Sequence, residues 1–134
     1  MRALSDFEGR WRVARLIDDR LAGRRGRFEG TVIFVPEGEG LRYHEAGELI
    51  MDGAKPMAAT RDYLWREGED GIEVFFEDGR PFHTIGEMAS HWCDPDQYDV
   101  AYDFSHWPDW QATWQVHGPR KDYRMESRFG RISP

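Results

Sequence analysis

The sequence has little cysteine, no long apolar run and no excess of positive charge. Its single cysteine, Cys93, excludes an internal disulfide, which is typical of proteins in a reducing compartment. No segment approaches the ~20 consecutive apolar residues that a membrane-spanning helix needs. Residues 1–9 contain Asp6 and Glu8 and no apolar run, unlike a secretory signal peptide. These absences predict a cytoplasmic protein with no membrane partner.

Acidic residues outnumber basic ones. The chain has 25 Asp and Glu against 18 Lys and Arg, which gives a net charge of −7 at pH 7. A surface of this sign repels phosphate backbones, so we expect no nucleic-acid partner.

Short strand-like runs separated by turn residues dominate the chain. Turn signals recur, for example at Asp52-Gly53, Asp78-Gly79 and Gly118-Pro119, and the runs between them are rich in aromatic and β-branched residues. Evenly spaced short strands of this kind predict an all-β fold, a single antiparallel up-and-down β-barrel. Only residues 3–8 resemble a short helical turn. No linker or repeat divides the chain, so we expect one domain over residues 1–134.

Alternation along the hairpins indicates which side chains face the interior, because residues that lie opposite each other share a face. In the hairpin around Asp52-Gly53, this rule places Glu45 opposite Arg61, both pointing inward. The alternate positions, such as Arg42 and Asp62, are polar and predict an outer, solvated face.

The inward faces combine aromatic rings with a few polar groups. Aromatic residues make up 14% of the chain, and such rings are good walls for a ligand cavity. A sealed apolar core would not tolerate the polar groups without partners, whereas an amphipathic cavity would. The predicted ligand-binding residues are Tyr43, Glu45, Arg61, Tyr63, Trp65, His83, His91, Tyr98, Tyr102, Trp114 and Tyr123.

Residues 7–11, Phe-Glu-Gly-Arg-Trp, resemble the Gly-x-Trp entry of lipocalins and fatty-acid-binding proteins. The resemblance implies that Trp11 closes one end of the barrel and that a basic residue near the chain end packs across it. If the first and last strands pair, Arg131 lies on Trp11, a cation–π contact worth roughly 0.5–2 kcal/mol.

A second resemblance covers nearly the whole chain. It rests on Tyr43-x-Glu45-x-Gly47, Arg61-x-Tyr63-x-Trp65, Asp78-Gly79-Arg80-x-Phe82-His83, His91-x-Cys93-x-x-Asp96-x-Tyr98, Tyr102-x-Phe104 and Trp114-x-Val116-x-Gly118-Pro119-Arg120-Lys121-Asp122-Tyr123. In this order, the motifs are similar to a family of short bacterial and fungal proteins, a domain of unknown function with a lipocalin-like (calycin) barrel. The resemblance implies the barrel and brings no established activity.

Two polar pairs each allow two interpretations. Glu45 either orients Arg61 to hold an anionic or carbonyl group of a ligand, or the two form an ion pair that satisfies itself. Arg120 and Lys121 are either solvated turn residues or line the barrel mouth and attract an anion.

His83, His91 and Cys93 share a predicted face and are the candidates for soft metal ligands. Their spacing matches no common zinc signature, so we predict no metal and no cofactor. The two histidines could instead serve acid–base chemistry, since histidine titrates near neutral pH. No nucleophile arrangement accompanies them, and whether the protein is an enzyme stays open.

The leading functional prediction is a barrel that binds a small, partly aromatic or anionic molecule in an amphipathic cavity. One alternative is a cofactor-free enzyme that uses His83 or His91 as acid and base. Another is a barrel filled by its own side chains that acts as a structural or interaction module. A homodimer is also open, because Trp107 either caps the barrel end or lies in a dimer contact.

Overall fold

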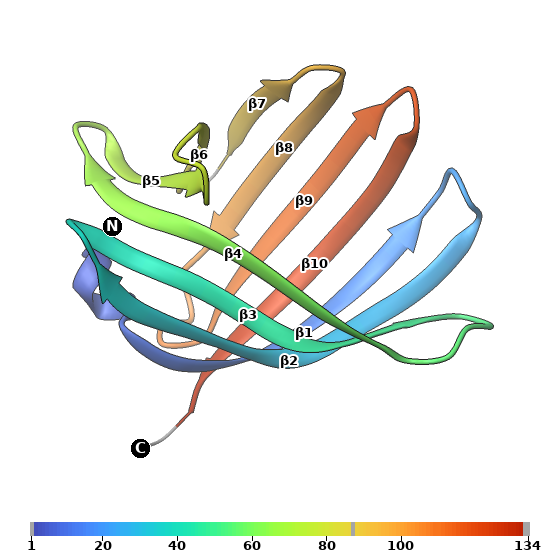
Figure 1. The fold of residues 1–134 in the computed structure, drawn as a ribbon, viewed down its shortest axis with the longest axis horizontal. Helices are drawn as coiled ribbons and strands as arrows, with labels where there is room; N and C mark the ends of the chain where they lie inside the picture. The colour runs from blue at the N-terminus through green and yellow to red at the C-terminus, as the bar shows by residue number, and fades with distance from the viewer. Residues whose placement is uncertain (1, 87, 133–134) are drawn as a thin grey trace.

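In the part of the chain that the structure describes, ten antiparallel strands form one sheet that curls into a nearly closed barrel (Figure 1). The computed structural model describes residues 2–86 and 88–132. A 3-10 helical turn, η1 (Leu4–Phe7), precedes the strands. The strands are β1 (Gly9–Asp19), β2 (Arg24–Glu37), β3 (Gly40–Met51), β4 (Met57–Gly68), β5 (Gly71–Phe76), β6 (Pro81–Thr84), β7 (Ala89–Cys93), β8 (Asp96–Asp103), β9 (Trp110–Gly118) and β10 (Lys121–Arg131).

The strand order is β6-β5-β4-β3-β2-β1-β10-β9-β8-β7. Strands that follow each other in the chain therefore pair, apart from β6 and β7, and β1 pairs with β10. In the described parts of the chain, no ladder joins β6 to β7, so the barrel has a seam there. The prediction of an all-β, single antiparallel up-and-down barrel with a short N-terminal helical turn is confirmed. No helix in residues 2–86 and 88–132 has the length and apolar character needed to cross a bilayer.

The register predicted from alternation is confirmed in the hairpin around Asp52-Gly53. In β3 and β4, Glu45 lies opposite Arg61 as predicted, and Tyr43 lies opposite Tyr63. In β9 and β10, Trp114 lies opposite Met125, and Trp110 lies opposite Phe129. These registers place the aromatic residues of four strands in a common interior.

Two facing glycines allow β2 and β3 to bend around this interior. A Cβ on Gly30 would lie 2.2 Å from the carbonyl oxygen of Ala46, and one on Gly47 would lie 2.2 Å from that of Glu29. Only glycine permits such close approach of two backbones, and glycine pairs are a common device for curving a sheet.

The β5–β6 hairpin departs from simple alternation. Val74 lies opposite His83, but the register shifts between Val74 and Phe75, so that Phe75 lies opposite Pro81. As a result, Phe82 and His83 are both buried although they are neighbours in the chain. Alternation predicted His83 inside but not Phe82, because a bulge cannot be seen from the period of the sequence.

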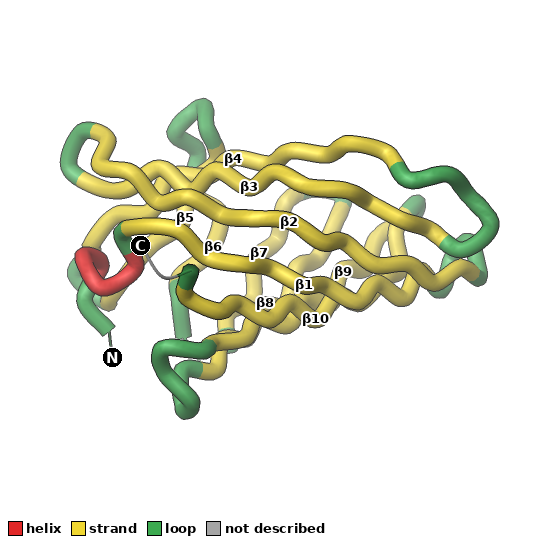
Figure 2. Tube along the Cα trace, turned by 90° about the horizontal axis from the view of Figure 1, so that it is seen from below, coloured by secondary structure: helices red, strands yellow, loops and turns green. Residues whose placement is uncertain are grey.

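One end of the barrel is closed as the lipocalin resemblance implied. Trp11 lies opposite Arg131, and the Arg131 guanidinium carbon is 4.0 Å from the centroid of the Trp11 ring. Arg131 also donates hydrogen bonds to the backbone carbonyls of Asp6 and Glu8. Figure 2 shows η1 at this end, beside the C-terminal residues. Trp107 packs on Phe7 and Trp11 with ring centroids 5.1 and 5.6 Å away, so it caps the barrel end.

Candidate functional site

All eleven predicted site residues lie on the strands, and they differ in burial. Five are buried: Tyr43, Glu45, Trp65, His83 and Tyr102. Six are half-buried: Arg61, Tyr63, His91, Tyr98, Trp114 and Tyr123. Figure 1 shows the β1–β2, β3–β4 and β9–β10 turns at the end of the barrel opposite η1. Of the half-buried set, Tyr123 lies close to this end, since β10 begins at Lys121 after the β9–β10 turn.

The carboxylate of Glu45 is bound by Arg15, a residue that the sequence analysis did not select. Arg15 Nη1 donates to Glu45 Oε2 at 2.9 Å and Nη2 to Oε1 at 2.7 Å, a bidentate pair. Both side chains are buried, with 6% and 2% exposed. The sequence contained the information needed to place Arg15 inside. Its position in β1 alternates in step with Trp11 and Val13, so all three side chains point into the barrel.

Two hydroxyl groups complete the hydrogen bonding of this pair. Tyr43 donates to Glu45 Oε1 at 2.5 Å, and Arg15 Nε donates to the Ser127 hydroxyl at 2.6 Å. Burial alone would raise the pKa of Glu45, but the hydrogen bonds and charge of Arg15 outweigh it, and the pKa is lowered. Glu45 is therefore a carboxylate at neutral pH. We call Arg15, Tyr43, Glu45, Arg61 and Ser127 the interior cluster.

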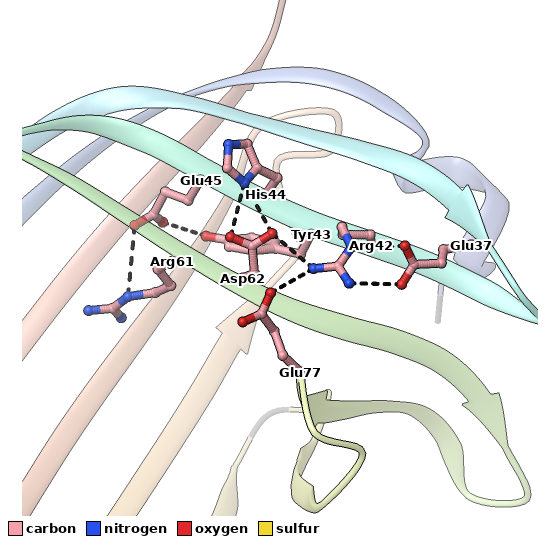
Figure 3. Close-up of polar contacts among 8 residues, drawn as sticks. All are labelled: Glu37, Arg42, Tyr43, His44, Glu45, Arg61, Asp62 and Glu77. Carbon is pink, nitrogen blue, oxygen red and sulfur yellow. Dashed lines mark hydrogen bonds and ion pairs between the residues drawn. The ribbon is translucent and has the colours of Figure 1, made fainter.

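Arg61 is the loosely held member of the interior cluster. Its Nε lies 3.9 Å from Glu45 Oε2, beyond hydrogen-bonding distance, and 33% of the side chain is exposed. Its guanidinium carbon lies 5.6 Å from the Trp114 ring centroid. Figure 3 shows Arg61 on the same side of β4 as Glu45. The predicted Glu45–Arg61 register is right, but the hydrogen-bonded partner of Glu45 is Arg15. Two guanidinium groups thus share one carboxylate, which leaves an excess positive charge at Arg61.

His83 and Tyr102 form a second polar pair in the interior. His83 Nε2 and the Tyr102 hydroxyl share a hydrogen bond of 2.9 Å, and His83 Nδ1 is buried without a partner among the described residues. Burial, with a smaller effect of nearby His91, lowers the pKa of His83 to about 3. Burial also raises the pKa of Tyr102. A histidine that is neutral and this weakly basic is poorly matched to proton transfer near neutral pH, which disfavours His83 as the general base.

The three candidate metal ligands do not converge. His91 lies opposite Tyr98 in the β7–β8 ladder, whereas Cys93 lies opposite Asp96. In the part of the chain that the structure describes, no group of three or more His, Cys, Asp or Glu side chains is placed to hold a metal ion.

Lys121, at the start of β10, is engaged by two residues of β8. Its Nζ lies 2.9 Å from Asp96 Oδ2 and donates to the Tyr98 hydroxyl at 3.2 Å. These contacts raise the pKa of Lys121. The Asp96 carboxylate neutralises the positive charge of the Lys121 ammonium group. Arg120 is exposed. Arg61 is therefore a better candidate than Lys121 for attracting an anion to this end of the barrel.

The interior is almost filled by side chains. The cavity between the interior cluster and the surrounding rings has a volume of about 20 Å³, close to the room that one water molecule needs. Small-molecule pockets measure roughly 300–1,000 Å³. A ligand larger than water therefore has to bind at the half-buried end or displace a side chain.

Comparisons with known proteins bear on the fold and the family. The family model DUF6314, described as a family of unknown function, matches residues 7–131. No curated protein matches the sequence significantly. The structure is similar to that of the S-type phycobiliprotein lyase CPES from Guillardia theta, with a TM-score of 0.68 and 10% sequence identity, over 98% of this chain and 91% of that one. At this identity the likeness shows the barrel fold alone.

Proposed function

The chain belongs to the DUF6314 family of unknown function, and we propose that its barrel binds a small anionic molecule with an aromatic part, held through Arg61. The observation that carries the proposal is the imbalance of the interior cluster. Arg15 occupies both oxygens of Glu45 at 2.9 and 2.7 Å, whereas Arg61 Nε lies 3.9 Å from the same carboxylate. A half-buried guanidinium in this position is suited to a carboxylate or phosphate group, which it can bind with two parallel hydrogen bonds.

The surroundings of Arg61 favour an aromatic ligand. Tyr63, on the same face of β4, and Trp114 have ring centroids 6.3 Å apart, and the Trp114 face lies against the guanidinium. Apolar walls with one charged group that fixes orientation are typical of small-molecule sites. The phycobiliprotein lyase supports the proposal only through its fold, and no activity is carried over from it.

A titration of matched ligands tests this function. The probes are 3-phenylpropanoate and its uncharged amide, measured by isothermal titration calorimetry at low salt. We expect the carboxylate to bind at least about tenfold more tightly than the amide, since one charge-assisted contact contributes about 1.5–3 kcal/mol. Arg61→Met should abolish this preference. Arg66→Met is the matched control, because Arg66 is exposed on the outer side of β4.

The result also separates this function from the filled-barrel alternative, which the cavity volume of about 20 Å³ favours. A structural module would bind neither probe. If Arg61→Met leaves carboxylate binding intact and lowers only the stability of the protein, Arg61 is a structural residue and the proposed function is wrong.

A further inference from the structure

Phe82 occupies the centre of a ring-lined space at the barrel seam. Its side chain is 2% exposed. Phe76 of the same hairpin stacks on it at 4.5 Å between centroids. Rings from four further strands surround it: Tyr63 at 5.8 Å, His91 at 5.4 Å, Tyr98 at 5.2 Å and Trp114 at 5.3 Å. We call these four side chains the aryl box. Three of them meet Phe82 edge to face, the geometry that aromatic pairs prefer.

The strand that carries Phe82 is held weakly. β6 has four residues, pairs only with β5, and borders the seam where no ladder to β7 exists in the described chain. A hollow of about 300 Å³ lies between the facing edges, lined by residues of β5, β6 and β7. The hydrogen bond between His83 and Tyr102 is the side-chain polar contact that ties β6 to β8. Short edge elements with few hydrogen bonds open at low free-energy cost.

The aryl box and Arg61 share a wall. Trp114 lies 5.3 Å from the Phe82 ring centroid and 5.6 Å from the Arg61 guanidinium carbon. A single aromatic ring in the position of Phe82, joined to an acidic group by a short chain, could therefore reach Arg61. A larger fused ring system would need more of the box to move.

We propose that the aryl box is a binding subsite for the aromatic ring of an aryl carboxylate, and that Phe82 fills it when no ligand is bound. This inference rests on the proposed function and deepens it, since it names the ligand class and the side chain that yields. Binding moves Phe82 toward the seam hollow and breaks the His83–Tyr102 hydrogen bond. The edge-to-face contacts that Phe82 loses are replaced by those of the incoming ring, so the carboxylate contact with Arg61 decides the net affinity.

Hydrogen exchange on the wild-type protein tests the displacement directly. With 3-phenylpropanoate bound, amides of residues 82–84 should exchange faster, while those of β4 and β9 exchange more slowly. Hexanoate, an alkyl acid that can contact Arg61 without entering the box, should leave residues 82–84 unchanged. Unchanged or slower exchange of residues 82–84 with the aryl acid overturns the inference.

Substitution of Phe82 gives a second readout. Phe82→Ala removes the ring that fills the aryl box. The variant should bind 3-phenylpropanoate at least about tenfold more tightly than the wild type, because the box no longer has to open before binding. The affinity for hexanoate should change by less than about threefold. Phe82→Leu is used if the alanine variant does not fold, with a smaller gain in the same direction. Leu16→Ala, at an exposed position of β1 away from the seam, is the control.

The outcomes distinguish the inference from the function on which it rests. If the wild type binds carboxylates in an Arg61-dependent way and Phe82 substitutions do not alter the preference for aryl over alkyl acids, only the inference fails. If neither the wild type nor Phe82→Ala binds either acid, both fail. Binding by Phe82→Ala alone shows that Phe82 is a permanent core residue, which also overturns the inference.

Discussion

The two faces of the β3–β4 ladder carry opposite charge arrangements (Figure 3). On the outer face, Arg42 donates to three carboxylates, Glu37, Asp62 and Glu77, and His44 contacts Asp62 as well. On the inner face, one carboxylate lies between two guanidinium groups. Carboxylates thus outnumber Arg42 in the outer group, and guanidinium groups outnumber Glu45 in the inner group. The ladder residues of both groups alternate along β3 and β4, while Glu37, Glu77 and Arg15 reach them from other parts of the chain.

Burial of the charged groups decides how strongly each arrangement contributes to stability. Arg42 and its partners are in contact with water, which screens their charges and makes exposed ion pairs weak. Arg15 and Glu45 are desolvated, so their pairing is strong and the loss of one partner is costly. Arg61, at 33% exposure, is about as accessible to water as Arg42 at 28%. Unlike Arg42, it has no carboxylate within hydrogen-bonding distance among the described residues, because Glu45 is bound by Arg15, so its charge is accessible to a ligand.

The largest expected effect comes from breaking the inner pair. Arg15→Met leaves Glu45 buried without its bidentate partner and should lower the free energy of unfolding by about 3–5 kcal/mol. Urea denaturation at pH 7 measures it. The double variant Arg15→Met/Glu45→Met should recover much of the loss, because no uncompensated charge remains. Equal losses in the single and double variants would show that the cost is one of packing.

A second effect concerns acid. The pKa of His83 is about 3 in the folded protein and 6.5 for the free side chain. The unfolded chain thus binds more protons between these values, so the stability due to His83 is full above pH 6.5 and is lost as the pH falls toward 3.

Urea denaturation between pH 7.5 and pH 5 checks the acid effect. The slope should approach about 1.4 kcal/mol per pH unit below pH 6. His83→Leu should flatten the curve in this window. A wild-type slope near zero would mean that His83 becomes protonated without cost.

A smaller effect is expected on the outer face. Arg42→Met should shift the urea midpoint by less than about a fifth of the shift caused by Arg15→Met, since exposed ion pairs contribute little. The shift should shrink further at 1 M salt, where charges are screened within about 3 Å. An effect that is large and independent of salt would remove the contrast between the two faces.

The smallest effect on stability is expected for Arg61→Met. Glu45 keeps both hydrogen bonds from Arg15, so the free energy of unfolding should change by no more than about 0.5 kcal/mol. The same variant should lose the preference for a carboxylate ligand. A destabilisation comparable with that of Arg15→Met would assign Arg61 to the fold instead of to binding.

Much of the barrel was predictable from local pattern. Alternation and the turn at Asp52-Gly53 predicted Glu45 opposite Arg61, and the Gly-x-Trp entry predicted Arg131 on Trp11. The first prediction holds because a hairpin turn sets the register of its two strands and alternation assigns the faces. The second was implied by the resemblance to lipocalins and holds because the first and last strands pair.

The errors share a cause. Phe82 was missed because a bulge breaks alternation, and Arg15 was missed as the partner of Glu45 because the two lie on strands that are not neighbours. Arg15 lies opposite Phe28 of β2. Its side chain extends across the Phe28 ring, with the guanidinium carbon 5.1 Å from the ring centroid, and reaches Glu45 on β3. Pairing rules describe neighbouring strands and say nothing about a side chain that reaches past one.

The sequence by itself determined the strands, their order and most of the inward faces, since these follow from turn chemistry and a period of two. The closed end was implied by the resemblance of its Gly-x-Trp segment to lipocalins. Only the tertiary structure decided which guanidinium neutralises Glu45 and which is left to face a ligand. The physical reason is curvature. When the sheet curls, long side chains from separate strands meet in a small interior, and the partner of a buried charge is then chosen by distance and desolvation instead of by sequence spacing.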